Sequence, residues 1–429
     1  MAARSPTVWA MFVGIDFGTT NSAIAIAGDD GVRLVPLGGA PHPKGAGSPG
    51  SSLAYWRTVL YFEPGGALTA GTPAIDRYLE TEGDGRLIQS IKSHLASSSF
   101  TKTQIFARRV TLEDMIAAFL RQLRAGAAID LGNRAVVGRP VRYWGAEDDA
   151  DDARAVARMR DALGRAGFDE VVFELEPVGA AASYAARLAR EELIVVADYG
   201  GGTTDFSVIR VGPHTAEVLA NGGIGVSGDA FDARVIDAVV APALGRGTKY
   251  VCDEMGNTAL VPAWIYGKLR RWHYLSFLRE ESTTRLLERV SSGAVEPRQI
   301  EKLIRIVEED LGMPLHRAVE GAKVRLTQQG EDRVALAALD LDLPVAREAF
   351  EGWLVDDLDA IDKVLDDVLA RAGVAPAQID RVFATGGSSL VPVVRGRLAA
   401  RFGAAKLVGG EELTSVAWGL AARAKQVFG

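Results

Sequence analysis

The sequence predicts an α/β protein built from two similar halves, and three observations lead to this prediction. Segments with the pattern of strands alternate with segments with the pattern of helices, which is typical of sheets flanked by helices. Two short motifs far apart in the chain repeat the same order of residues. The chain also has 429 residues, too many for one small hydrophobic core. We expect lobe I at residues 11–189, with an inserted subdomain at about 39–110, and lobe II at residues 190–429, with an inserted subdomain at about 229–330.

The composition narrows the class of protein. Hydrophobic residues make up 48% of the chain and charged residues 24%, as in ordinary globular proteins. The net charge of −7 argues against a nucleic-acid partner, because nucleic-acid-binding domains are usually basic. Cys252 is the single cysteine, so no internal disulfide can form. No apolar stretch approaches the roughly 20 residues of a membrane span, so we expect a cytoplasmic protein without a membrane partner.

The repeated motif joins two strands through a turn rich in glycine and threonine. The first copy contains Asp16, Gly18, Thr19, Thr20 and Asn21. The second copy contains Asp198, Gly200, Gly201, Gly202, Thr203 and Asp205. Each copy has the pattern of a β-hairpin whose first strand ends in a carboxylate.

These turns have the chemistry of a nucleotide site. Backbone N–H groups and threonine hydroxyls in such a turn can hold phosphate oxygens. A carboxylate repels bare phosphate, so Asp16 and Asp198 imply a bridging cation, for which Mg²⁺ is the best fit. One such hairpin alone is typical of an ordinary tight turn, whereas its repetition favours two lobes that hold one nucleotide. We therefore expect ATP binding and hydrolysis.

Three further segments are weaker candidates when taken alone. Glu176 follows the predicted strand 171–175 and precedes a proline, so its carboxylate would face the edge where α/β folds bind ligands. Lys92 lies where a predicted helix ends, although most lysines are only solvated. Gly386, Gly387 and Ser388 form a turn after the predicted strand 381–385. Paired glycines there would let the backbone approach a flat adenosine, but an ordinary strand-to-helix connection explains them equally well.

A dinucleotide site is a competing interpretation. Gly223, Gly225 and Gly228 have the spacing of the glycine fingerprint, between the predicted strand 217–220 and the predicted helix 230–240. Asp253 follows the next predicted strand at about the distance of a ribose-binding acid. This interpretation leaves both repeated hairpins unexplained.

Taken together and in this order, the motifs resemble the ATPase domain of the 70-kilodalton heat-shock chaperone family, within the actin–hexokinase superfamily. The two hairpins resemble its two phosphate motifs, Glu176 and Pro177 its connecting segment, and Gly386–Ser388 its adenosine motif. Gly228 and Asp229 resemble its loop after the second hairpin, which accounts for the dinucleotide-like glycines. Glu320, Lys323 and Thr327 resemble its helix beside adenosine. The resemblance covers residues 11–428.

The resemblance implies a two-lobed actin-like ATPase fold, with duplicated sheet cores, two smaller capping subdomains and a cleft for ATP or ADP with Mg²⁺. It implies that Asp16 and Asp198 position the metal, and that Lys92 neutralises the γ-phosphate and orients the attacking water. Thr203, Glu176 and Asp205 would align that water and the metal shell. The nucleotide would be held by Asp16, Gly18, Thr19, Thr20, Asn21, Gly200, Gly201, Gly202, Thr203, Gly228, Asp229, Glu320, Lys323, Thr327, Gly386, Gly387 and Ser388. Such catalysis rests on positioning and electrostatics.

The sequence also departs from the family. The family's chaperones continue into a peptide-binding domain, whereas this chain stops at Gly429, so we expect it to resemble shortened bacterial relatives without that domain. We therefore expect a slow ATPase that acts as a chaperone-like nucleotide switch, with an unknown client or co-chaperone-like partner. The alternatives are a nucleotide-gated scaffold with negligible turnover and a small-molecule kinase of the same superfamily.

Overall fold

The computed structural model describes residues 11–38, 55–81, 84–185, 188–213, 215–270, 281–408 and 415–429. The chain divides into two compact units. The first unit is Met1–Gly223 together with Val364–Ser389 and Leu398–Gly429. The second unit is Ile224–Lys363 together with Leu390–Arg397. The two lobes predicted with a boundary after residue 189 stay a prediction.

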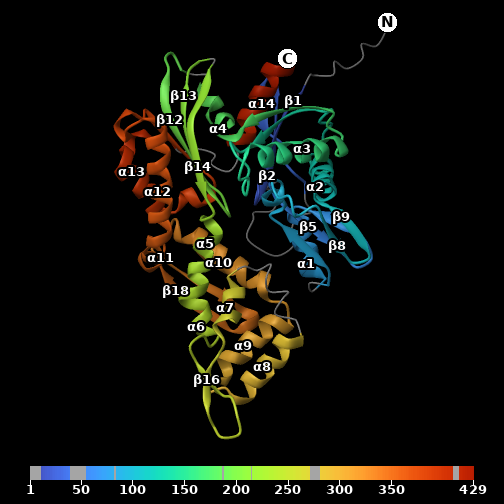
Figure 1. Ribbon diagram of the computed structural model, residues 1–429, viewed down its shortest axis with the longest axis vertical. Coiled ribbons are helices and arrows are strands. Elements are labelled where there is room, and N and C mark those ends of the chain that lie inside the picture. Colours follow the sequence, from blue (N-terminus) through green and yellow to red (C-terminus); the bar gives the residue numbers. More distant parts are fainter. Residues whose placement is uncertain are drawn as a thin grey trace. The chain divides into compact units, whose positions relative to one another are not determined.

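The first unit contains two large sheets (Figure 1). The first sheet contains β1 (Phe12–Phe17), β2 (Asn21–Gly28), β3 (Gly31–Leu34), β10 (Arg134–Arg139) and β11 (Glu170–Leu175), with the short β4 (Trp56–Arg57) beside β2. The second sheet contains β12 (Glu192–Tyr199), β13 (Thr204–Val211), β14 (Ala216–Ile224), β19 (Arg381–Thr385) and β20 (Leu407–Val408).

The two sheets have the same strand order. In each, a hairpin lies at the centre: β1 pairs antiparallel with β2, and β12 pairs antiparallel with β13. A third strand lies beyond each hairpin, β3 in one sheet and β14 in the other. On the opposite side two parallel strands follow, β10 and β11 in one sheet and β19 and β20 in the other. The predicted α/β fold with duplicated sheet cores is confirmed.

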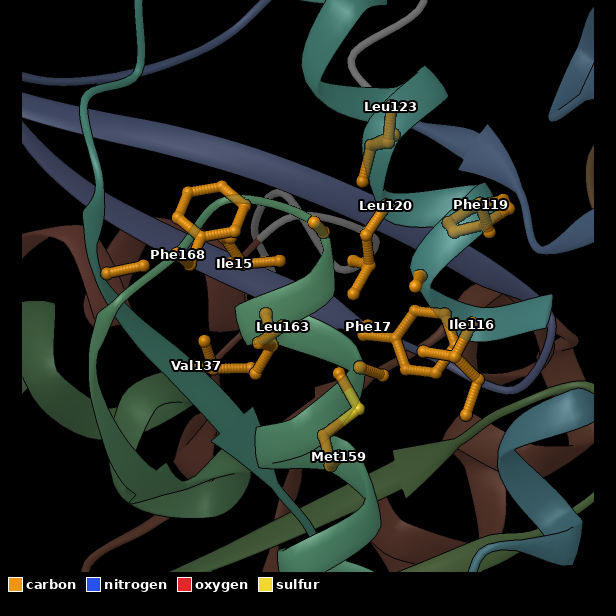
Figure 2. Close-up of a cluster of buried hydrophobic side chains, with 14 of the residues drawn as sticks. Ile15, Phe17, Ile116, Phe119, Leu120, Leu123, Val137, Met159, Leu163 and Phe168 are labelled. Carbon is orange, nitrogen blue, oxygen red and sulfur yellow. The ribbon is translucent and has the colours of Figure 1, made fainter. Parts of the chain in front are cut away.

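Helices α2 (Leu112–Gly126) and α3 (Asp149–Arg165) contribute to a hydrophobic core of the first unit (Figure 2). The apolar spacing of Leu112, Met115, Ile116, Phe119 and Leu123 predicts a helix over residues 111–128 that opens at Thr111, and α2 confirms it. Thr111 caps the helix, because its hydroxyl accepts the Asp114 N–H while the Asp114 carboxylate accepts the Thr111 N–H. Phe17 of β1 packs against Phe119 of α2, with ring centroids 5.6 Å apart. This packing fixes the strand that carries Asp16.

Two further helices, α4 (Glu176–Ala185) and α14 (Ser415–Phe428), pack closely against each other. A Cβ atom added to Gly419 would lie 1.7 Å from the Gly179 carbonyl oxygen. A Cβ atom on Gly14 of β1 would lie 2.1 Å from the Ala421 nitrogen. Glycine is therefore required at both contacts, which bring α14 against the strand of Asp16 and the helix of Glu176.

Smaller elements complete the first unit: β5 (Val59–Phe62), β6 (Leu68–Ala70), α1 (Thr72–Glu80), β7 (Arg86–Gln89), β8 (Lys102–Ile105) and β9 (Arg108–Thr111). The prediction of a helix ending near Lys92 was wrong. Lys92 lies in a short 3-10 turn, Ile91–His94, directly after β7. Ser90 adopts a left-handed conformation with φ of 55°, which separates the strand from the turn.

The sequence pattern predicts a largely helical segment at residues 229–330, and the second unit is mostly helical. It contains α5 (Gly228–Val235), a π-helical stretch (Ile236–Val240), α6 (Ala241–Ala243), α7 (Ala263–Leu269), α8 (Glu281–Gly293), α9 (Pro297–Glu308), α10 (Gly312–Leu326) and α11 (Arg347–Trp353). Its strands are β15 (Lys249–Val251), β16 (Thr258–Leu260), β17 (Glu331–Leu336) and β18 (Leu341–Ala346). Helices α12 (Val355–Ala372) and α13 (Pro392–Phe402) belong partly to each unit.

The dinucleotide interpretation is wrong. That fingerprint requires a strand, a helix and a second strand parallel to the first in one sheet. Here β14 ends the second sheet, whereas β15 pairs antiparallel with β16 in a separate hairpin. Within the described ranges, no helix is both long enough and apolar enough to cross a bilayer.

Candidate functional site

The two repeated turns lie against each other in the first unit. The first turn follows Asp16 in β1, and a Cβ atom on Gly18 would lie 2.2 Å from the Asn21 carbonyl oxygen. The second turn follows Asp198 in β12 and is closed by the Gly200 N–H, which donates to the Thr203 carbonyl oxygen at 2.9 Å. A Cβ atom on Gly201 would lie 2.3 Å from the Thr20 hydroxyl oxygen. The structure therefore brings the two predicted phosphate turns together.

A buried ion pair lies beside these turns. The Lys92 Nζ donates to the Glu176 Oε1 at 2.6 Å, and the two side chains are only 10% and 16% exposed. Burial alone would lower the pKa of Lys92, but the negative charges of Glu176 and Asp16 hold this pKa above its usual value. Lys92 is therefore a permanent cation at neutral pH, surrounded by carboxylates.

The aspartates of the two hairpins have perturbed pKa values. Burial, followed by the charges of Glu176 and Asp198, raises the pKa of Asp16 to about 7. Burial and the charge of Glu176 also raise the pKa of Asp198. The Asp205 side chain lines a groove with Asp198 and Glu176. Desolvation, followed by the charge of Asp198, raises the pKa of Asp205 to about 7. Carboxylates that repel one another in this way favour a bound cation.

The predicted adenosine turn adjoins the second hairpin. Gly386 has φ of 80°, and a Cβ atom there would lie 2.1 Å from the Tyr199 carbonyl oxygen. The Ser388 hydroxyl donates to the Gly200 carbonyl oxygen at 3.2 Å. Gly387 begins the short 3-10 helix that follows. Glycine at 386 thus lets this turn pack directly on the end of β12.

The remaining predicted nucleotide residues lie in the second unit. Gly228 and Asp229 begin α5, whereas Glu320 and Lys323 lie in α10, with Thr327 directly after it. The Lys323 Nζ donates to the Asp232 Oδ2 at 2.9 Å and to the Gly228 carbonyl oxygen at 3.3 Å. Burial raises the pKa of Asp232 to about 6, although Lys323 opposes the shift. The structure thus joins α5 and α10, while the adenosine roles of these residues stay predictions.

Sequence reasoning assigned no role to two residues that the structure places in the site. The Thr385 hydroxyl donates to the Asp198 Oδ1 at 3.0 Å from the parallel strand β19. Tyr143 is 3% exposed, and burial raises its pKa to about 12, while the charge of Lys92 lowers this pKa and that of Glu176 raises it. Thr385 could have been found as a polar residue at the end of a predicted strand. No sequence signal pointed to Tyr143.

The carboxylate groups of the site are suitable for binding Mg²⁺ together with a nucleotide. Among the described residues, no group of three or more histidine, cysteine or acidic side chains could hold a metal ion. Mg²⁺ usually takes one or two protein carboxylates and completes its shell with water and phosphate, so Asp16 and Asp198 are sufficient. The Asn21 Oδ1 is buried and accepts no hydrogen bond from any residue that the structure describes, so it could accept one from water or a ligand at the first turn.

Comparisons with known proteins agree with the fold. A sequence model of the Hsp70 protein family matches residues 85–251. Chaperone protein DnaK of Thermosipho melanesiensis is 28% identical over 397 residues, which are 91% of this chain and 55% of that protein. DnaK of Thermosipho africanus is 28% identical over 389 residues, covering 89% and 53%. DnaK of Thermotoga petrophila is 27% identical over 389 residues, covering 89% and 54%.

The chain therefore spans about half the length of the curated relatives that it matches. Matches of this extent, together with the duplicated sheets and their paired turns, support an Hsp70-family, ATPase-like protein. The predicted resemblance to the ATPase domain of this family is confirmed.

Proposed function

We propose that the protein binds ATP with Mg²⁺ between its two repeated turns and hydrolyses it slowly. One observation supports the proposal: the two turns lie together beside the buried Lys92–Glu176 ion pair and three aspartates whose pKa values are raised. These aspartates are Asp16, Asp198 and Asp205. Carboxylates with perturbed pKa values are typical of functional sites, as are turns whose backbone N–H groups can bind an anion.

Each group of site residues would have a separate role in binding or hydrolysing ATP. The backbone N–H groups of Gly18–Asn21 and Gly200–Thr203 would donate to the phosphate oxygens. Bound Mg²⁺ would neutralise phosphate charge, and Asp16 and Asp198 would hold it directly or through water. Lys92 would stabilise negative charge on the γ-phosphate, while Glu176 fixes the Lys92 ammonium. Asp205 and Thr203 would orient the attacking water.

Because the relatives are named chaperones, we also propose that nucleotide turnover drives a conformational switch of the chaperone type in the cytoplasm. A client or co-chaperone-like protein would then be its partner. A scaffold that closes on ATP without turnover is the second candidate, and it would use the same turns.

The test is a turnover assay with purified protein, Mg²⁺ and ATP, with and without candidate phosphate acceptors. Slow phosphate release that needs Mg²⁺ and no acceptor supports the proposal. Product formation only with an acceptor would make the protein a kinase, and tight ATP binding without turnover would make it a scaffold. Asp198→Ala serves as the control, with an expected loss of roughly 10²–10³ in rate and a modest change in ATP affinity.

A further inference from the structure

We propose that the hairpin of β8 and β9 is a docking surface for a short acidic polypeptide segment. The hairpin lies in the first unit, where β9 contacts α2 (Figure 1). None of its residues takes part in the nucleotide site proposed above, so this interaction is separate from ATP binding. The proposal rests on the charge of the hairpin, on its aromatic tip and on its open strand edge.

The hairpin is basic in an acidic protein. The chain has 55 acidic and 48 basic residues, yet residues 85–112 include no aspartate or glutamate. Lys102, Arg108 and Arg109 are exposed, and none of them has an acidic partner in the part of the chain that the structure describes. Arg86 is exposed beside them and donates to the Gln104 carbonyl oxygen at 3.0 Å. Unpaired positive charge in a negative molecule attracts an acidic partner and steers it to this place.

An exposed aromatic side chain forms the tip of the hairpin. Phe106 is 48% exposed and is the first residue of the two-residue turn between β8 and β9. Its φ is 50°, a conformation that is unfavourable for a bulky residue and that glycine adopts freely. The hairpin turn requires this positive φ, and the chain carries a phenylalanine there instead of the glycine that would relieve it. Aromatic and arginine side chains together are typical of the anchors of protein interfaces.

The open edge of β9 favours a polypeptide over other anions. Directly opposite residues in an antiparallel pair alternate between hydrogen-bonded and non-hydrogen-bonded pairs. Ile105 and Arg108 flank the turn as a bonded pair, so the backbone groups of the next pair, Gln104 and Arg109, point outward. The outward carbonyl group of Gln104 accepts a hydrogen bond from the Arg86 side chain. The outward backbone groups of Arg109 face no described strand, because β9 pairs only with β8 in the part of the chain that the structure describes.

An extended peptide can therefore exchange two backbone hydrogen bonds with Arg109, which a nucleic acid or a lipid headgroup cannot do. Side chains alternate across a strand, so Arg108 and Arg109 point to opposite faces of the hairpin. Two consecutive acidic residues in the added strand would meet both arginines. An apolar residue beside them would contact Phe106.

The experiment measures binding of a fluorescein-labelled peptide of repeated Glu-Glu-Val to the full chain by anisotropy. We expect binding that weakens with salt, and a loss of roughly tenfold or more in the variant Arg108→Glu/Arg109→Glu. Arg33→Glu is the matched control, because Arg33 is an exposed arginine of β3 in the first sheet. This control should bind as the wild type does. All three proteins should hydrolyse ATP equally, so failure here is distinct from failure of the nucleotide proposal.

Phe106→Gly separates binding from folding. It removes the aromatic side chain and relieves the unfavourable φ, so peptide affinity should fall while thermal stability stays equal or rises. No binding of the acidic peptide to the wild type, or equal binding to the charge-reversed variant, would overturn the proposal. Tighter binding of oligothymidine or of phosphatidylserine vesicles than of the peptide would also overturn it.

Discussion

The Lys92 Nζ lies 2.6 Å from the Glu176 Oε1, although 84 positions separate the two residues in the sequence. Lys92 comes from the 3-10 turn after β7, and Glu176 begins α4 directly after β11. Both side chains are nearly buried, so each charge depends on the other for its stability. Lys92 also faces Asp16, which lowers the cost of placing that carboxylate in the interior.

Lys92→Ala should abolish turnover while ATP remains bound. Its cation matters most when negative charge moves during cleavage, so its loss affects the rate more than the affinity. Single-turnover hydrolysis and an ATP titration measure the two effects separately. A wild-type rate would leave Lys92 with only a structural role, and lost affinity with an unchanged saturated rate would make it a binding residue.

This variant also leaves Glu176 buried without its partner, which lowers stability for a reason unrelated to catalysis. The double variant Lys92→Met/Glu176→Gln removes both charges and keeps similar volumes. We expect the double variant to melt closer to the wild type than Lys92→Ala does, and to remain inactive. Recovery of both stability and turnover would contradict a catalytic role for the pair.

The raised pKa of Asp16 predicts how stability depends on pH. The folded protein binds a proton at Asp16 up to a pKa of about 7, whereas the unfolded chain releases it near 3.8. The folded state therefore holds more protons between these values, and its stability falls as pH rises through them, by up to about 1.4 kcal/mol per pH unit.

Asp16→Asn should weaken this dependence without removing it, because the raised pKa values of Asp198 and Asp205 act in the same direction. Without nucleotide, the variant should be more stable than the wild type at about pH 8, with a smaller difference at about pH 5. Thermal melts of both proteins across that range measure the effect. A difference that does not change with pH would show that Asp16 is already ionised in the folded protein at low pH.

Most of what the sequence predicted correctly is local. The two hairpins, the capped helix after Thr111 and the strand Arg381–Thr385 follow from short-range patterns of apolar residues, turns and caps. Lys92 was placed at the end of a helix because nothing in the sequence marks Ser90 as left-handed. The pairing of Lys92 with Glu176 and the hydrogen bond from Thr385 to Asp198 depend on tertiary packing, so they had no local signal.

Gly419→Ala should destabilise the protein, although alanine usually favours a helix over glycine. The added Cβ atom would lie 1.7 Å from the Gly179 carbonyl oxygen, so α4 and α14 would have to separate. We expect a loss of about 1–3 kcal/mol. Gly396→Ala in α13 is the control, because nothing lies within 4 Å of its added Cβ atom. It should be neutral or stabilising by up to about 1 kcal/mol, and similar thermal shifts in both variants would contradict the close contact.

The segment that carries Lys92 is held by Arg158 of α3. The Arg158 Nη1 donates to the Ser97 carbonyl oxygen at 2.8 Å and to the Leu95 carbonyl oxygen at 3.2 Å. Its Nε lies 3.1 Å from the Glu113 Oε1, and both side chains are nearly buried. One guanidinium group thus donates hydrogen bonds to the carbonyl groups of the residues that directly follow the Lys92 turn. Its removal should therefore let that turn shift.

Arg158→Ala should therefore lower the saturated rate of ATP hydrolysis by roughly 10–100-fold, since a displacement of about 1 Å can have this effect. ATP affinity should change little, because the phosphate turns lie in other segments. Arg158→Lys should restore part of the rate. Arg121→Ala is the matched control, because Arg121 also donates to a backbone carbonyl group, that of Arg165 at the end of α3, and not to the segment that follows Lys92. If Arg121→Ala reduces the rate as much as Arg158→Ala at equal thermal stability, Arg158 does not position Lys92.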